Sequence, residues 1–325
     1  MSGFVPPDIH FFRISEVLAS ELPLCFTGKE MKRTISKKNT ELFEPYLLIA
    51  PLLILLAVFI LYPVIANIVM SFFKWNGIKK PEYIGIANYI EMFKDEKFWG
   101  SIKNTGILLL YIPLGVILPL IVSAVLREGL KGWSFFRAAL YLPNILGYVI
   151  MGSICNIVFR KTGPINNILT AFGLESLAKD WLMTPSLAIN SLGFVYGVWL
   201  RLGFGCIFFL AAMSSIDESL YDAAKIDGAK WWKTFFNVTL PSIRFSIEFW
   251  VVLSFIEVLA RAFSFIYTFT NGGPGFATFT LEYGIYTSGF VAFKMGYASA
   301  WASVLFVFCA IIAVFQVKLM KKEAE

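Results

Sequence analysis

The sequence predicts an all-α membrane protein with about six transmembrane helices. Hydrophobic residues make up 58% of the 325-residue chain and charged residues only 15%, whereas a soluble domain is roughly 45–50% apolar and about 25% charged. A helix needs about 20 apolar residues to cross a hydrocarbon core of about 30 Å. Six stretches meet this requirement: residues 45–73, 105–126, 138–159, 187–213, 245–268 and 293–317.

Prolines inside these stretches are compatible with membrane helices. In a bilayer, neighbouring helices can satisfy the backbone groups that a proline or glycine releases. The prolines concerned are Pro51, Pro63, Pro113, Pro119 and Pro143.

Residues 1–44 precede the first stretch and form an N-terminal segment. Its part from Phe11 to Phe26 is weakly amphipathic and lies ahead of Met31-Lys32-Arg33. A cleaved signal peptide would need a basic region directly before an apolar one, and that order is missing. Either residues 1–30 form an extra segment at the membrane interface, or they are dispensable and Met31 is the true start. We favour the second interpretation.

Basic residues near the ends of the stretches predict the orientation of the chain, because cytoplasmic loops carry an excess of Lys and Arg. They gather before the first stretch, in the second and fourth connections and in the tail: Lys29, Lys32, Arg33, Lys37, Lys38, Arg127, Lys131, Arg137, Lys225, Lys230, Lys233, Arg244, Lys318, Lys321 and Lys322. With six alternating spans these segments share one side, so both termini are predicted to be cytoplasmic. Residues 74–104 carry six lysines and do not follow this rule. We interpret them as an outer, partly folded segment.

Several kinds of site are excluded by residue content. The net charge of +6 follows from the cytoplasmic basic residues and needs no nucleic acid. No Gly-x-x-x-x-Gly-Lys-Ser/Thr loop occurs, so the chain is not expected to bind ATP itself. The single His10 cannot form a cluster, and Cys within a span is usually a small packing residue. No nucleophile, acid–base or metal-ligand constellation predicts an enzyme or a metal site.

One polar segment interrupts the membrane-type sequence. Leu220–Pro241 reads LYDAAKIDGAKWWKTFFNVTLP and carries five charged residues beside Trp231, Trp232, Phe235 and Phe236. This mixture suits docking onto another protein better than solvation. Gly228 is expected to end a helix here, because glycine accepts backbone angles that other residues avoid. The alternative is an amphipathic linker that lies on the membrane surface.

The pattern Asp222-Ala-Ala-x-x-Asp227-Gly228-Ala229, followed by Leu240-Pro241, resembles the cytoplasmic coupling loop of bacterial ABC importer permeases. That family usually has Glu in first place, and Asp222 keeps the charge on a shorter arm. Other segments resemble the carbohydrate branch of the family, on the side of the maltose importer's larger permease. They are LLIAPLLILLAVFILYPVIANIVMSFFKWNG at 47–77, IGIANYIEMF at 84–93, FWGSIKNT at 98–105, FFRAALYLPNIL at 135–146, WLRLGF at 199–204 and FIYTFTNGGPG at 265–275.

This resemblance implies a type I ABC importer permease, with a permease domain over residues 45–322 and a coupling loop at 214–244. It also implies a second permease subunit, two ATPase subunits that hold ATP and Mg, and an extracytoplasmic solute-binding protein. The chain itself would be a non-catalytic, multi-pass subunit of the bacterial inner membrane that binds no cofactor. Movement of the coupling loop with an ATPase would favour inward-facing or outward-facing states of a central cavity in turn.

The resemblance also assigns candidate site residues. The ATPase-coupling group would be Asp222, Ala223, Ala224, Asp227, Gly228 and Ala229. The substrate path would be lined from the fourth and fifth spans by Trp199, Leu202, Gly203, Cys206, Val258, Leu259 and Ala262. Positions Leu259 and Ala262 are polar amides in the maltose relative and apolar here, which argues against simple maltose. Trp199 would either stack on a sugar ring or serve as an ordinary packing residue.

Arg201 and Arg261 complete the predicted substrate path, and the charged residues inside the spans suggest the kind of sugar. Arg201 has no obvious partner on its own helix, whereas Glu257 and Arg261 lie four residues apart. Many carbohydrate permeases have Gln or a small residue at Arg261 and Asp at Ser264, so this cavity would be more positive. Since a guanidinium can hold a carboxylate by two hydrogen bonds, we hypothesise an acidic sugar, such as an alginate-type uronate oligosaccharide. Alternatively, the Glu257–Arg261 pair is structural, or a partner chain's acid completes the network.

Two alternative functions differ from this one. A secondary transporter would need substrate and ion sites in one chain, often with paired broken helices from internal repeats, and neither is visible in the sequence. An ABC permease for a neutral sugar or for a sugar phosphate is the other alternative.

Overall fold

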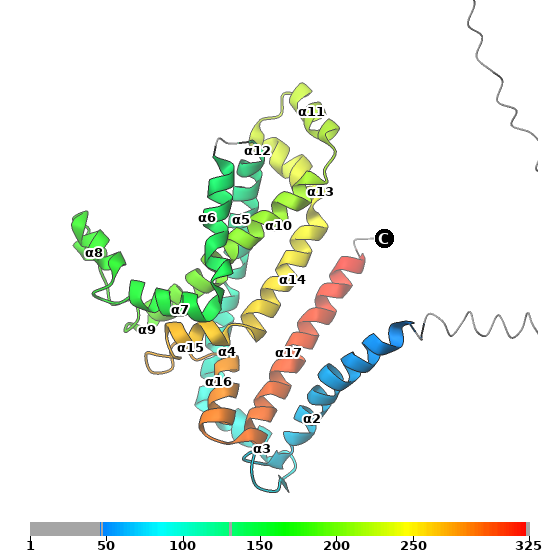
Figure 1. Ribbon diagram of the computed structural model, residues 1–325, viewed down its shortest axis with the longest axis vertical. Helices are drawn as coiled ribbons and strands as arrows, with labels where there is room; N and C mark the ends of the chain where they lie inside the picture. Colours follow the sequence, from blue (N-terminus) through cyan, green and yellow to red (C-terminus); the bar gives the residue numbers. More distant parts are fainter. Residues whose placement is uncertain (1–45, 47, 130–131, 323–325) are drawn as a thin grey trace, which may run out of the picture. The chain divides into compact units, whose positions relative to one another are not determined.

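The computed structural model describes residues 46, 48–129 and 132–322, which are largely helical (Figure 1). The chain divides into two compact units, residues 1–64 and 65–325. Within the described ranges the only strands form a short antiparallel hairpin, β1 (Phe73–Lys74) and β2 (Glu82–Tyr83). The predicted all-α membrane class is confirmed. The predicted N-terminal segment, including the alternatives for residues 1–30, lies outside the described residues.

In the part of the chain that the structure describes, four continuous helices are long and apolar enough to cross a membrane: Leu48–Met70, Glu96–Arg127, Pro185–Ser214 and Met295–Gln316. They coincide with the first, second, fourth and sixth predicted stretches. The first includes the π-helical η1 (Ala57–Leu61) and α2 (Tyr62–Met70), and the second consists of α4 (Glu96–Leu109) and α5 (Ile112–Arg127). The fourth stretch comprises α9 (Pro185–Phe194), the π-helical η3 (Val195–Trp199) and α10 (Leu200–Ser214), and the sixth falls in α17 (Met295–Lys322).

The third and fifth predicted stretches are broken helices, which the sequence did not reveal. In the third, α6 (Trp133–Ile145) meets α7 (Gly147–Val158) at 98°, and in the fifth, α14 (Arg244–Ala260) meets α15 (Phe263–Phe269) at 54°. The first break falls at Gly147, whose φ of +73° is a conformation that side chains with a Cβ rarely adopt. Counting each bent pair as one span gives six spans, the number predicted.

Shorter elements fill the connections. The predicted partly folded segment contains the hairpin and α3 (Ala87–Lys94), and the connection after α7 contains α8 (Pro164–Ala171) and the 3-10 turn η2 (Glu175–Leu177). After α10 come α11 (Glu218–Ile226), α12 (Trp231–Thr234), the π-helical η4 (Phe235–Thr239) and α13 (Leu240–Ser242). After α15 come α16 (Leu281–Tyr286) and the π-helical η5 (Thr287–Val291).

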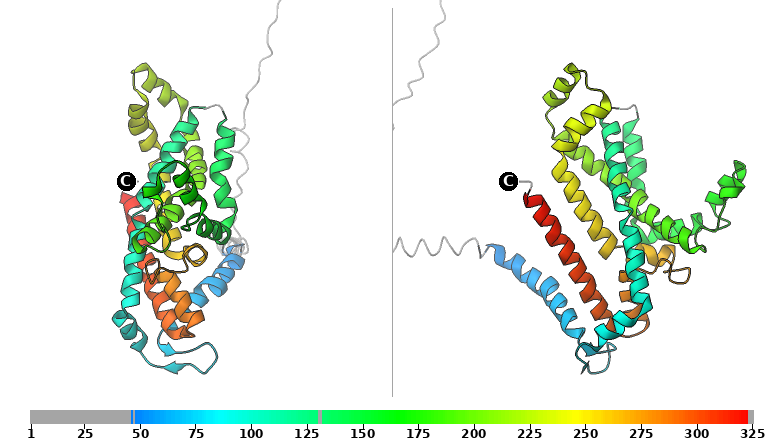
Figure 2. Two further views of the ribbon diagram at one scale, coloured as in Figure 1. Left: turned by 90° about the vertical axis from the view of Figure 1, so that its left-hand side faces the viewer. Right: turned by 180° about the vertical axis from the view of Figure 1, so that it is seen from behind.

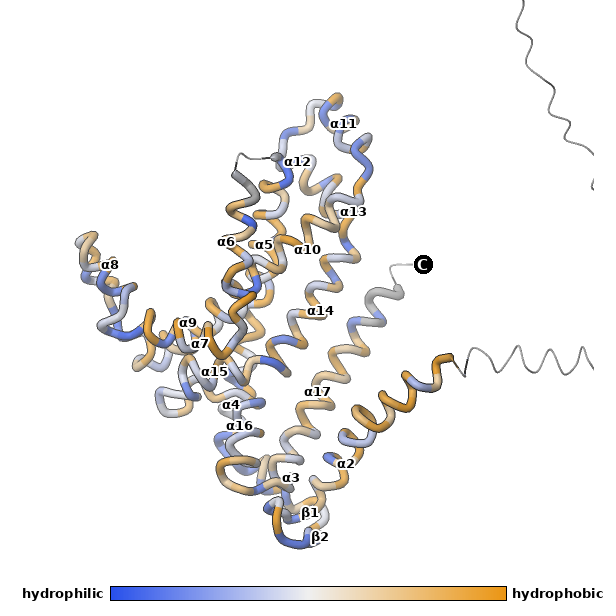
Figure 3. Tube along the Cα trace, viewed as in Figure 1, coloured by the Kyte–Doolittle hydropathy of each residue, from blue (hydrophilic) through white to orange (hydrophobic). Residues whose placement is uncertain are grey.

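Within residues 65–325, the polar elements lie at opposite ends of the long helices. In every view α11 and α12 occupy one end, and the hairpin with α3 occupies the other (Figure 1 and Figure 2). Figure 3 shows hydrophilic residues on α11 and β2, while α5, α10 and α17 between these ends are mainly hydrophobic. This distribution suits helices that cross a bilayer between two polar ends.

The core of this unit packs around Trp250 of α14. The Trp250 side chain is fully buried, and its indole N–H donates to the carbonyl oxygen of Gly115 on α5 at 3.2 Å. Its ring stacks on Phe208 of α10, with ring centroids 5.3 Å apart. Trp250 therefore ties the fifth span to the second and the fourth.

Candidate functional site

Helix α11 begins at a side-chain cap. A carboxylate oxygen of Asp217 accepts a hydrogen bond from the backbone N–H of Ser219 at 2.9 Å, which satisfies a donor that has no partner inside the helix. Hydrogen bonding from Ser219 holds the pKa of the exposed Asp217 carboxyl below its usual value. None of the residues of α11 is buried, so this cap helps to fix where the helix starts.

Helix α11 ends in a Schellman motif. The N–H of Gly228 donates to the carbonyl of Lys225 at 3.0 Å, and the N–H of Ala229 donates to the carbonyl of Ala224 at 2.9 Å. This pair of bonds needs a left-handed residue just past the helix end, and Gly228 supplies it at φ +69°. The predicted helix end at Gly228 is confirmed.

The six residues of the predicted coupling group are therefore contiguous with α11. Asp222, Ala223 and Ala224 lie within the helix, Asp227 is its C-terminal cap residue, and Gly228 and Ala229 form the turn. Asp222 accepts a hydrogen bond from Lys225 at 3.0 Å, and both side chains are exposed. Such an exposed pair contributes little stability, so these charges remain available to a partner.

Two aromatic pairs follow α11 and differ in exposure. Trp231 and Phe235 stack with ring centroids 5.3 Å apart, and Phe235 belongs to the buried core. Trp232 and Phe236 stack at 6.0 Å but are 56% and 57% exposed. On α11 itself, Ile226 is 87% exposed. The loop thus presents an apolar surface of its own besides its charges.

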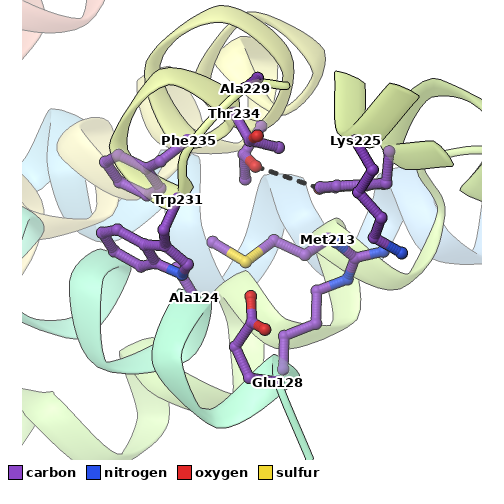
Figure 4. A pocket seen from close by; sticks show the side chains of 11 residues that line it. Ala124, Glu128, Met213, Lys225, Ala229, Trp231, Thr234 and Phe235 are labelled. Carbon is purple, nitrogen blue, oxygen red and sulfur yellow. Dashed lines mark hydrogen bonds between the residues drawn. The ribbon is translucent and has the colours of Figure 1, made fainter. Parts of the chain in front are cut away.

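A pocket of about 210 Å³ lies between this loop and the ends of α5 and α10 (Figure 4). The guanidinium carbon of Arg127, the last residue of α5, lies 3.6 Å from the ring centroid of Tyr221 on α11. The Tyr221 hydroxyl is 3.1 Å from the hydroxyl of Thr239, to which it is hydrogen bonded. The pocket is lined by Ala124, Arg127, Glu128, Met213, Tyr221, Lys225, Ala229, Trp231, Thr234, Phe235 and Thr239.

The charged pair predicted in the fifth span is formed. Arg261 donates to one carboxylate oxygen of Glu257 at 3.0 Å, and the Tyr148 hydroxyl donates to the other at 2.8 Å. The Tyr196 hydroxyl donates to the backbone carbonyl of Glu257 at 3.0 Å. Glu257 therefore joins α14 to α7 and η3, while the Arg261 side chain remains 65% exposed. This network supports a structural role for Glu257 and leaves Arg261 accessible.

Arg201 lies inside the chain. It is only 6% exposed, and its guanidinium carbon is 5.0 Å from the ring centroid of Trp250. A cation over an indole face is attracted by the ring's quadrupole. Trp250 stands 49 positions further along the sequence, so no spacing on the helix of Arg201 could have predicted this contact.

The other predicted path residues divide into accessible and packed ones. Trp199 is 38% exposed, and Leu202 is partly buried. The rest are buried: Gly203, Cys206, Val258, Leu259 and Ala262. At Gly203 a Cβ would come within 2.1 Å of the carbonyl oxygen of Leu140, so glycine permits close packing of α10 on α6. In this conformation Trp199 and Arg261 are the predicted path residues with the most accessible side chains.

The connections that follow α7 and α15 border a second hollow. It measures about 600 Å³ and is bordered by Arg160 and Lys161 on one side and by the Asn271-to-Pro274 turn on the other. Arg160 is fixed by a hydrogen bond to the Asn156 side chain at 2.8 Å. Asn271, in that turn, accepts a hydrogen bond from the Tyr283 hydroxyl at 2.7 Å. The turn thus borders this hollow and is held by a side-chain hydrogen bond.

Sequence reasoning missed the residues that support these sites. Tyr148, Tyr196 and Trp250 read as ordinary aromatic span residues, because their partners are distant in the chain. Glu282 was also missed: its carboxylate accepts the N–H of Phe263 at 2.7 Å, at the break between α14 and α15. A lone acid in a connection without Lys or Arg was the only available signal. Among the described residues no group of three or more potential ligands could hold a metal ion.

These features define a multi-span helical membrane protein that exposes charged and aromatic side chains on a loop at one end. Residues 83–323 match the family of binding-protein-dependent transport system inner membrane components, and the chain belongs to this family. It is accordingly a non-catalytic transmembrane permease component of an ABC transporter.

Known relatives span nearly the same length. The chain is 32% identical over 295 residues to the probable ABC transporter permease protein YurN of Bacillus subtilis (strain 168), covering 88% of this chain and 99% of the relative. It is 32% identical over 276 residues to the lactose transport system permease protein LacF of Rhizobium radiobacter, covering 83% and 92%. A chain in the crystal structure of a bacterial ABC transporter that imports the acidic polysaccharide alginate matches with a TM-score of 0.75 and 25% identity, covering 90% of this chain and 100% of that one.

Proposed function

We propose that this chain is the permease subunit of an ATP-driven, solute-binding-protein-dependent carbohydrate importer. The observation that carries the assignment is the capped helix α11, held at one end of the spans and followed by exposed aromatics. The relatives support the substrate class, because one is named for lactose transport and another imports alginate. A second permease subunit would complete the translocation path.

The exposed face of the 214–244 loop is the proposed docking site for one of two ATPase subunits. Exposed apolar side chains beside charges are typical of protein interfaces, and this loop exposes Ile226, Trp232 and Phe236 as well as Asp222 and Asp227. ATP and Mg would remain on the ATPases. Both termini and this loop would lie on the cytoplasmic side, where the basic residues gather.

The test is reconstitution of the chain with its partner permease and ATPases in proteoliposomes. We expect the four subunits to copurify, and ATP hydrolysis to rise when the substrate-loaded binding protein is added. Uptake driven by an ion gradient without the ATPases would instead identify a secondary transporter, and would overturn the assignment.

For the substrate we propose an acidic oligosaccharide of the uronate type. Its support is the accessible Arg261 guanidinium next to Glu257, together with the likeness to the alginate importer. A neutral sugar is the second candidate, favoured by the likeness to the lactose permease and by the buried position of Arg201. Competition of uptake by anionic and by neutral oligosaccharides of equal length separates the two candidates.

A further inference from the structure

Helix α11 has few attachments to the spans. Of its nine residues only Tyr221 and Ala224 are partly buried, and the others are exposed. The pocket of about 210 Å³ between the loop and the spans shows that this region is not filled by close packing (Figure 4). A movement of α11 must therefore pass to the spans through particular contacts.

Tyr221 supplies two such contacts from one side chain. Its ring lies against the Arg127 guanidinium at 3.6 Å, and Arg127 is the last residue of α5. Its hydroxyl is hydrogen bonded to Thr239, which is 4% exposed and lies in η4, just before the fifth span. Tyr221 thus connects α11 both to the second span and to the chain that enters the fifth.

The stack depends on the shape of the guanidinium as well as on its charge. Arginine is planar and stacks on aromatic faces, whereas the lysine ammonium is a compact, strongly hydrated charge on a flexible stem. Lys225 and Glu128 also line this pocket. Because Arg and Lys carry the same charge, replacing Arg127 by Lys would leave the net charge of the pocket unchanged. Charge and stacking can therefore be tested separately.

We propose that the Arg127–Tyr221 stack is the positioning contact through which movement of α11 is transmitted to the second span. The proposal rests on the proposed function, in which α11 moves with a docked ATPase. Tyr221 and Arg127 act here through the spans and not by touching substrate or nucleotide. Docking itself is assigned to the exposed face of the loop, so loss of the stack should leave the ATPases bound.

The test uses the full reconstituted complex and matched variants at both positions. Tyr221→Leu removes the ring and Arg127→Lys removes the planar cation, whereas Tyr221→Phe keeps the ring and loses only the hydroxyl. We expect Tyr221→Leu and Arg127→Lys each to lower binding-protein-stimulated transport by about fivefold, the change expected when one cation–π contact is lost. Subunit stoichiometry and basal ATP hydrolysis should stay at the wild-type level. Tyr221→Phe should retain most of the binding-protein-stimulated transport.

The double variant Arg127→Lys with Tyr221→Leu should be no worse than either single one, because both remove the same contact. Lys294→Arg, at an exposed ion pair with Glu91, is the control for exchanging cationic groups. The proposal would be overturned if binding-protein-stimulated transport were unchanged in both single variants. It would also be overturned by additive losses of transport in the double variant, or by loss of the ATPases from the complex. A wild-type complex without stimulated hydrolysis would instead contradict the proposed function.

Discussion

Glu257 accepts hydrogen bonds from two side chains, and these explain how a carboxylate is tolerated inside a span. Tyr148 and Arg261 each occupy one of its oxygens, at 2.8 Å and 3.0 Å. Removing one partner of a buried ion pair is strongly destabilising when it strands a charge, but Tyr148 would remain if Arg261 were changed. Arg261 can therefore be tested for substrate contact with limited structural damage.

Replacing Arg261 by Gln should reduce the preference for anionic over neutral oligosaccharides. A charge-assisted hydrogen bond is worth about 1.5–3 kcal/mol, so the change in preference should be about tenfold or more. Binding-protein-dependent uptake of the two sugar classes into proteoliposomes measures it. The double variant Glu257→Gln with Arg261→Gln is the control, since restored preference there would show that Arg261 acts only as the partner of Glu257. Arg201→Gln removes the cation that lies against the Trp250 ring. This variant is expected to lower thermal stability.

Gly228→Pro and Asp227→Lys should abolish binding-protein-stimulated ATP hydrolysis while the spans stay folded. Proline fixes φ near about −65° and lacks the N–H, whereas Gly228 has φ +69° and donates to Lys225. Lysine at 227 reverses a charge on the exposed loop. Stimulated hydrolysis in the reconstituted complex and helical content by circular dichroism are the measurements. Full stimulation in both variants would remove this loop from the coupling mechanism.

At the scale of elements, α11 owes its ends to hydrogen bonds, because it buries no residue of its own. Asp217→Ala removes the N-terminal cap and should weaken stimulated hydrolysis, whereas Asp217→Asn should preserve it, because Asn caps helices about as well as Asp. The pKa of Asp217 is lowered, so the charged cap is present at neutral pH and is lost only as the pH falls through that lowered pKa. Equal activity of the Ala and Asn variants would show that the cap is irrelevant to coupling.

The break in the fifth span depends on a residue outside it. Glu282 accepts the N–H of Phe263, the first residue of α15, at 2.7 Å. Glu282→Ala should leave this donor without its partner and destabilise the fold by about 1–3 kcal/mol. Thermal unfolding in detergent measures the loss. Glu282→Gln keeps an acceptor and should lose less, so equal losses would argue against the hydrogen bond as the cause.

At the scale of the whole molecule, the sequence predicts that the segment before Met31 is dispensable. The first apolar stretch begins only at about residue 45, so a chain that starts at Met31 retains every span. We expect this truncated chain to assemble with its partners and to transport at the wild-type rate. Copurification and uptake are the checks. Loss of assembly would show that residues 1–30 contact a partner subunit or the membrane surface.

The number of spans and the end of α11 were predictable from the sequence because both are local properties. Hydrophobic length sets the number of spans, and the left-handed conformation at Gly228 follows from a glycine placed after a helical pattern. The Glu257–Arg261 pair was predictable for the same reason, since the two residues are one helical turn apart.

The break in the fifth span, the burial of Arg201 and the Arg127–Tyr221 stack were decided only by the tertiary structure. Each depends on residues far apart in the chain: Phe263 with Glu282, Arg201 with Trp250, and Arg127 with Tyr221. Apolar composition is the same in a straight helix and in a bent one, and a lone cation in a span does not indicate which ring lies above it. The sequence by itself therefore determined which segments enter the membrane and where the polar loop ends its helix. Packing between distant segments decided which charges are satisfied internally and which remain accessible.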